Sequence, residues 1–191
     1  INFVKNKHLF FNIFLSSIPI MLVGYPLIKL NLIEQLRNIK VIGWMTIIFG
    51  LLLFFSDRCK INKVVEKEFN YKTAMFIGLF QILALVPGVS RSGIAITAAR
   101  ILKYDRFSSA KISFLLSIPT LAAVSLFGIK NLVTSEDLNF SILNLISIFL
   151  SFIFSYITIK FFMKYIQNFS LNIFVIYRIV LGMILLILSY L

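Results

Sequence analysis

The chain has 191 residues, of which 60% are hydrophobic and only 14% are charged. A soluble domain usually carries about 25% charged residues, so this composition excludes an ordinary water-soluble enzyme. The net charge of +12 does not indicate a nucleic-acid partner, because the basic residues lie in short stretches between apolar segments, as they do beside membrane helices. We therefore expect one membrane domain over residues 1–191 and no nucleic-acid binding.

Apolar runs of membrane-spanning length recur along the chain. At 1.5 Å per residue, a helix needs about 20 apolar residues to cross a hydrocarbon core of about 30 Å. The first predicted span is Leu9–Ile28, and the second is Val41–Phe55, in which Gly43 and Gly50 offer close helix contact. The most polar stretch, residues 56–72, comes next. Later in the chain we predict three more spans, at Ser108–Gly128, Ser141–Phe162 and Leu171–Tyr190.

The segment at about residues 73–102 follows a different pattern. Thr73–Val86 is apolar but has only 14 residues, which as a helix would be about 21 Å long, too short to span. Pro87-Gly88 then breaks the helix, and Ser90–Leu102 can form a second short one. This pattern predicts a re-entrant hairpin. The predicted fold is an all-α polytopic membrane protein with five transmembrane helices and one re-entrant helical hairpin.

The distribution of Lys and Arg supports the hairpin and predicts its orientation. A full crossing at residues 73–102 would divide the loop cations eight against eight. A hairpin divides them twelve against four, which places the richer face in the cytoplasm. The richer face carries Lys5, Lys7, Arg58, Lys60, Lys63, Lys67, Lys72, Lys103, Arg106, Lys111, Lys160 and Lys164, and the other carries Lys29, Arg37, Lys40 and Lys130.

The hairpin tip has the composition of an anion site. Gly88 lets the backbone approach a ligand, and the helix that starts after the break directs free N–H groups toward the tip. Arg91 supplies a planar fork for two phosphate oxygens, and an arginine at membrane depth is costly enough to indicate function. The residues predicted to bind the anion are Gly88, Ser90, Arg91, Ser92, Gly93 and Thr97.

These residues resemble a known family, the undecaprenyl-diphosphate phosphatases, also called bacitracin-resistance proteins. The likeness runs in order along the chain and is most specific in the Pro-Gly-x-Ser-Arg-Ser motif. Its other parts are Phe80-Gln81, Leu85-Val86 before the motif, Tyr104-Asp105-Arg106, residues 114–119 and Ile176-Tyr177-Arg178.

The resemblance implies hydrolysis of a polyprenyl diphosphate to the monophosphate, for recycling of the lipid carrier used in cell-wall synthesis. It also implies two inverted repeats with one hairpin each, and a divalent cation, Mg²⁺ or Ca²⁺. The paired glutamates and the Ser-Ser-Thr-Gly-His-like string of the family's first repeat are not found here, and no acid lies within a predicted span. We therefore expect the chain to begin after that repeat, with the metal ligands outside it. Ala95 replaces a threonine that is common in the family.

The expected site opens to the outer side of the membrane. Arg91 is predicted to bind the diphosphate, and Ser90 is either the nucleophile or a hydrogen-bond donor. Gln81 is interpreted as a ligand to substrate or partner hairpin, or as a packing amide. Arg178 is interpreted as pairing with a helix carbonyl or the hairpin end, with catalysis as the alternative. A flippase for phosphorylated lipids and an inactive fragment of the enzyme are the alternative functions.

Overall fold

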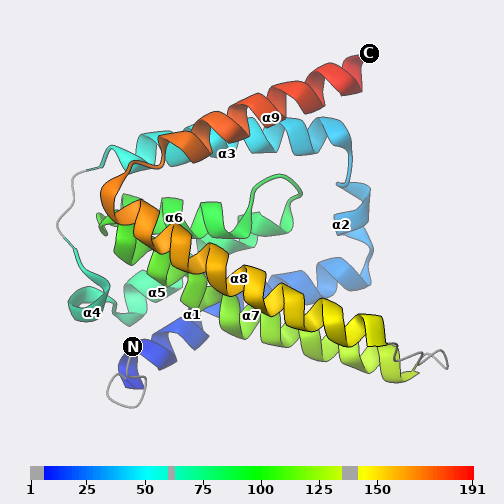
Figure 1. The fold of residues 1–191 in the computed structure, drawn as a ribbon, viewed down its shortest axis with the longest axis horizontal. Coiled ribbons are helices and arrows are strands. Elements are labelled where there is room, and N and C mark those ends of the chain that lie inside the picture. Colours follow the sequence, from blue (N-terminus) through cyan, green and yellow to red (C-terminus); the bar gives the residue numbers. More distant parts are fainter. Residues whose placement is uncertain (1–6, 60–62, 135–141) are drawn as a thin grey trace.

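The computed structural model describes residues 7–59, 63–134 and 142–191 (Figure 1). Its long helices confirm the five predicted spans, because five of them have the length and composition to cross a membrane. Within the described ranges we find no strand beyond one isolated bridge, so the protein is an all-α polytopic membrane protein. The five helices are α1 (Lys7–Lys29), α3 (Ile39–Asp57), α7 (Arg106–Thr134), α8 (Ile142–Asn168) and α9 (Asn172–Tyr190).

Two short helices stand where the hairpin was predicted. α5 (Tyr71–Ile82) continues into a 3₁₀ turn, η1 (Leu83–Leu85), and α6 (Arg91–Ile101) follows after the break. The segment turns back on itself, because the Lys63 N–H donates to the Lys103 carbonyl at 3.2 Å. The chain that leads into α5 thus lies against the chain that leaves α6. Re-entry of this segment into a bilayer stays a prediction.

Element boundaries differ from the predicted ones where the chain becomes polar. The predicted loops contain two four-residue helices, α2 (Leu32–Gln35) and α4 (Val65–Glu68). α3 runs on to Asp57, two residues past its predicted end, and α8 runs six residues past Phe162 to Asn168. The added residues of α8 include Lys164, whose apolar stem can lie along the helix while its charged end stays in the interface.

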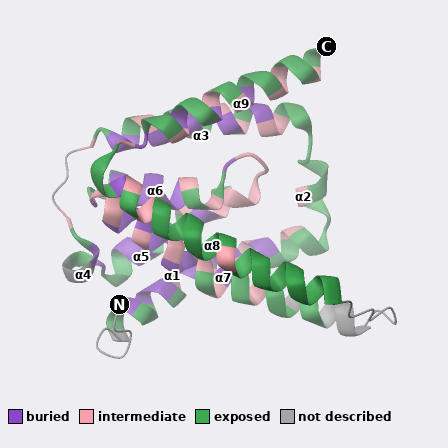
Figure 2. Cartoon of the chain, in the orientation of Figure 1, coloured by how far each residue is buried: buried purple, intermediate pink, exposed green. Residues whose placement is uncertain are grey.

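α6 lies at the centre of the molecule (Figure 1), and its ribbon is buried along most of its length (Figure 2). Ala95, Ala98 and Ala99 are each no more than 1% exposed. Small side chains let neighbouring helices approach closely, so α3, α5 and α7 all pack against α6. α8 is mostly exposed in the same view, as expected for a helix that faces lipid.

α3 and α9 run side by side (Figure 1). Glycines permit this contact: a Cβ atom on Gly43 would lie only 3.3 Å from the carbonyl oxygen of Gly182. The same atom would also lie 2.9 Å from the Leu186 side chain. The predicted role of Gly43 in close helix contact is therefore confirmed. The pairing brings Arg178 of α9 against the middle of α3, next to the hairpin tip.

Candidate functional site

The break between α5 and α6 is a tight turn that needs glycine. Gly88 has φ +95°, and a Cβ atom there would lie 2.5 Å from the Ile42 carbonyl oxygen. Ser90 also has positive φ, at 69°, which is uncommon for a residue with a side chain. Ser90 caps α6, because its Oγ accepts a hydrogen bond from the Gly93 N–H at 3.2 Å. The sequence motif therefore forms a turn held in one defined conformation.

Arg178 holds this turn from α9. Its Nη2 donates to the carbonyl oxygens of Gly88, at 2.8 Å, and Val89, at 2.9 Å. Its Nε donates to the Thr46 carbonyl of α3 at 3.3 Å, and the residue is 8% exposed. Arg178 thus makes the contact with the hairpin end that was expected of it. Nη1 lies beside Gly93, where a Cβ atom would come within 2.7 Å of it.

A cavity of about 280 Å³ begins at this turn, and we call it the serine cavity. At its polar end the two serines lie close together, with 3.4 Å between the Ser90 and Ser92 Oγ atoms. Arg178 is the only cation among the lining residues. Hydroxyl groups, a guanidinium and a helix N-terminus therefore meet in one place. The polar end is lined by Thr46, Gly88, Ser90, Ser92, Gly93 and Arg178.

Two predicted site residues point elsewhere. Arg91 Nη1 donates to Thr120 Oγ1 of α7 at 2.6 Å, and Arg91 is not among the residues that line the serine cavity. Thr97 is 2% exposed and donates to the Gly93 carbonyl at 2.8 Å within its own helix, so it does not line the cavity either. Ala95 is 1% exposed, packs in the hydrophobic core and is not among the residues that line the serine cavity.

Gln81 is fully buried on α5, and neither of its side-chain polar atoms finds a hydrogen-bond partner among the described residues. A buried polar atom without a partner costs about 1–3 kcal/mol. Such groups are few in native proteins and call for an explanation. A buried amide without a hydrogen-bond partner agrees with both interpretations of Gln81, which are contact with the substrate or a partner hairpin and a purely packing role.

Gln81→Leu is expected to raise the free energy of unfolding by about 1 kcal/mol, since leucine has no polar atoms to leave unsatisfied. Thermal unfolding in detergent measures this, with the exposed Gln167→Leu of α8 as the matched control. A fall in stability specific to Gln81→Leu would show instead that the amide has a partner in the membrane.

The described residues do not suit a divalent cation. No group of three or more His, Cys, Asp or Glu side chains among them is close enough to hold a metal ion. The serine cavity is lined by hydroxyl, guanidinium and apolar groups, whereas Mg²⁺ and Ca²⁺ prefer carboxylate and carbonyl oxygens.

Sequence reasoning missed a buried ion cluster at the other end of the hairpin. Asp57 is 6% exposed and receives two hydrogen bonds of 2.8 Å from Arg106, while Arg100 Nε lies 3.3 Å from Asp57 Oδ1. Arg100 Nη1 also donates to the Tyr104 carbonyl at 2.7 Å. The cluster joins the end of α3 to the end of α6 and the start of α7. Tyr104-Asp105-Arg106 was noticed as a motif, but its partner Asp57 lies 49 residues before Arg106.

Tyr104 closes the same end of the hairpin. Its hydroxyl donates to the Glu68 carbonyl of α4 at 2.9 Å, and its ring is fully buried. Burial raises the pKa of the Tyr104 phenol, so the group stays protonated and keeps this donor role.

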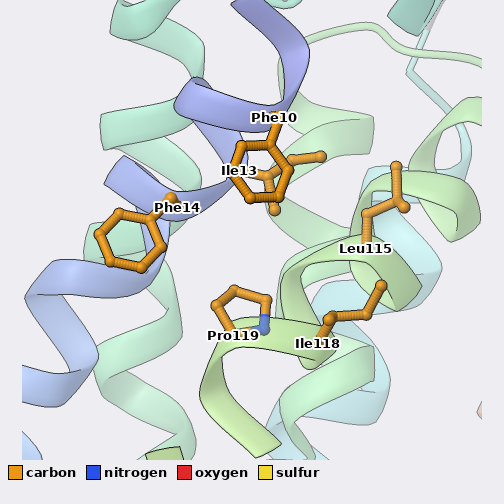
Figure 3. A pocket seen from close by; sticks show the side chains of 6 residues that line it. All are labelled: Phe10, Ile13, Phe14, Leu115, Ile118 and Pro119. Carbon is orange, nitrogen blue, oxygen red and sulfur yellow. The ribbon is translucent and has the colours of Figure 1, made fainter. Parts of the chain in front are cut away.

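A second hollow, of about 380 Å³, lies between α1 and α7. Figure 3 shows side chains from both helices bordering it. None of them carries a polar group, so this hollow cannot bind a phosphate. Its lining residues are Phe10, Ile13, Phe14, Leu115, Ile118 and Pro119.

Comparison with known proteins agrees with this geometry. The family model described as "Bacitracin resistance protein BacA" matches residues 3–184. A protein of Pelagibacter ubique (strain HTCC1062) named undecaprenyl-diphosphatase is 50% identical over 188 residues, which are 97% of this chain and 73% of that protein. A protein of the same name from Jannaschia sp. (strain CCS1) is 36% identical over 180 residues, covering 94% of this chain and 67% of that protein.

Proposed function

Because the chain belongs to the bacitracin resistance protein family, we propose that it hydrolyses undecaprenyl diphosphate to undecaprenyl phosphate and inorganic phosphate. The reaction consumes one water and breaks the bond between the terminal phosphorus and the bridging oxygen. The monophosphate would return to the lipid-carrier pool for cell-wall synthesis. The site would lie in a bacterial inner membrane and open to its outer side.

One observation carries this proposal: hydroxyl groups, a guanidinium and the start of α6 line a single cavity. Ser90 and Ser92 offer hydrogen bonds, and Arg178 offers positive charge beside Gly93. Helix N–H groups and the positive dipole end favour phosphate oxygens. Arg91, which starts the same helix, would turn from Thr120 to meet the second phosphate.

The hydrogen bonding of Ser90 favours a donor role over a nucleophilic one. Its Oγ already accepts from the Gly93 N–H, and with Ser92 as the donor between the two hydroxyls the Ser90 proton can bind a phosphate oxygen. A serine nucleophile needs a base to take that proton. No carboxylate or imidazole is found among the residues that line the cavity.

A divalent cation, Mg²⁺ or Ca²⁺, remains part of the proposal on the strength of the resemblance alone. The described residues offer no ligand set for it. The roles assigned here are therefore those of the chain's own hydroxyl, guanidinium and backbone groups.

Ser90→Gly tests the site without straining it, because glycine accepts the positive φ and costs only a few tenths of a kcal/mol as a cap. The assay is phosphate release from undecaprenyl diphosphate in proteoliposomes, using the protein with every residue that its gene encodes. We expect about a 100-fold fall in kcat, the lower end of the range for losing one preorganised donor. A fall to the uncatalysed rate would make Ser90 the nucleophile instead, and an unchanged rate would remove it from the site.

The same proteoliposomes distinguish a hydrolase from a lipid flippase. Phosphate release that follows the amount of protein supports the proposal. Movement of the lipid between leaflets without phosphate release would support the flippase and contradict it.

A further inference from the structure

The serine cavity has an apolar end as well as a polar one. One turn along α6 from Gly93 the lining residue is Ile96, and one turn back along α9 from Arg178 it is Phe174. Together with Phe162 of α8, these side chains form an apolar wall of the cavity. The apolar end is lined by Leu53, Ile96, Phe162, Leu171 and Phe174, and Tyr177 and Leu181, on either side of Arg178 in α9, complete the lining of the cavity.

The aromatic part of this wall is held in place by other rings. The Phe162 and Phe174 centroids are 5.1 Å apart at an interplanar angle of 62°. Phe114 of α7 packs edge-on against Phe162 at 5.5 Å, and Tyr165 packs against Phe174 at 5.9 Å. Edge-to-face contacts of this kind fix ring orientation. The wall is therefore a preformed surface rather than a loose set of lipid-facing side chains.

We propose that this apolar end binds the isoprenoid units nearest the diphosphate and makes Phe162 and Phe174 determinants of substrate chain specificity. The inference rests on the proposed function. The inference is supported by the shape of the cavity, whose polar and apolar ends are continuous and lie about one helical turn, 5.4 Å, apart. A prenyl diphosphate has the same arrangement, with a branched apolar chain joined directly to its anionic group.

The wall acts by positioning. Lipid tails are as apolar as the cavity, so moving the chain from bilayer to wall brings little hydrophobic gain. A chain held against fixed rings does orient the phosphorus relative to Ser90 and Arg178, and orientation raises rate. A diphosphate with a single isoprene unit reaches less of the wall and should benefit less.

Phe174→Leu tests the proposal by removing a ring while keeping an apolar side chain. The measurement is the ratio of kcat/KM for undecaprenyl diphosphate to kcat/KM for a diphosphate carrying one isoprene unit. We expect this ratio to fall about ten-fold, the lower range for one contact in an apolar pocket. Phe162→Leu should act in the same direction. Phe14→Leu makes the same change in the hollow between α1 and α7, where the ratio should stay as in the wild type.

A photoreactive group on the first isoprene unit of a prenyl diphosphate gives a second readout, independent of turnover. We expect it to label the stretch from Phe162 to Phe174. Labelling of Phe10 and Phe14 instead, or an equal fall in the ratio for Phe14→Leu, would overturn the inference. Folding of each variant is checked by its thermal midpoint. If the wild type released no phosphate from either substrate, the proposed function itself would fail, which is a separate result.

Discussion

Arg91→Ala is expected to reduce kcat/KM for phosphate release by about 100-fold or more. Removing one preorganised donor to a developing negative charge commonly costs 10²- to 10³-fold, and an arginine at a transferring phosphoryl group can contribute more. Arg91 starts α6, directly after the Ser90 cap, and is only partly exposed. Its guanidinium contacts Thr120 of α7, and after turning toward the serine cavity it would add its charge to the field of the helix N-terminus that acts on the phosphates of a bound lipid.

Arg91→Lys should also be impaired, because an ammonium group keeps the charge but cannot make the two parallel hydrogen bonds of a guanidinium. Thr120→Val separates this role from a structural one, since it removes the hydroxyl that Arg91 contacts at 2.6 Å and leaves the arginine in place. We expect Thr120→Val to lose far less activity than Arg91→Ala.

Arg37→Ala, which removes an exposed cation between α2 and α3, is the matched control and should leave phosphate release unchanged. Near-normal turnover of Arg91→Ala would remove the central role assigned to Arg91. In that case the positive charge for the substrate would come from Arg178, the cation that lines the serine cavity.

Asp57→Asn is expected to give the largest loss of stability. Asp57 is the only carboxylate in contact with both Arg100 and Arg106 in the described part of the chain, and its side chain is 4% exposed. Removing one partner of a buried ion pair costs about 3–5 kcal/mol, because the remaining charge stays buried without compensation. For a chain of this size we expect the thermal midpoint to fall by about 10 °C.

Thermal unfolding in detergent measures this, with Glu34→Gln of α2 as the control because Glu34 is an exposed carboxylate. Arg106→Gln should lower the midpoint less than Asp57→Asn, since Arg106 is 33% exposed and Arg100 would keep its partner. Equal midpoints for Asp57→Asn and Glu34→Gln would mean that the cluster does not stabilise the fold.

Local chemistry determined the spans and the break in the hairpin. Whether a segment can span the membrane depends on the length of its own apolar run. The central part of each predicted span therefore lies within one of the five long helices. Pro87-Gly88 ends a helix wherever it occurs, since proline lacks an N–H donor and glycine accepts the φ of +95° found here. The boundaries were less exact, and Asp57 was missed because the predicted span stopped at Phe55.

The sequence alone identified the residues at the hairpin tip, and only the tertiary structure decided which of them share a cavity. Ser90, Ser92 and Gly93 line it, whereas Arg91 contacts α7 and Thr97 bonds within its own helix. Arg178 lies against Thr46, 132 residues away in the chain, because glycines let α3 and α9 pack closely. A motif specifies neighbours along one helix. Which side chains converge in space depends on how the helices pack, and no local pattern carries that information.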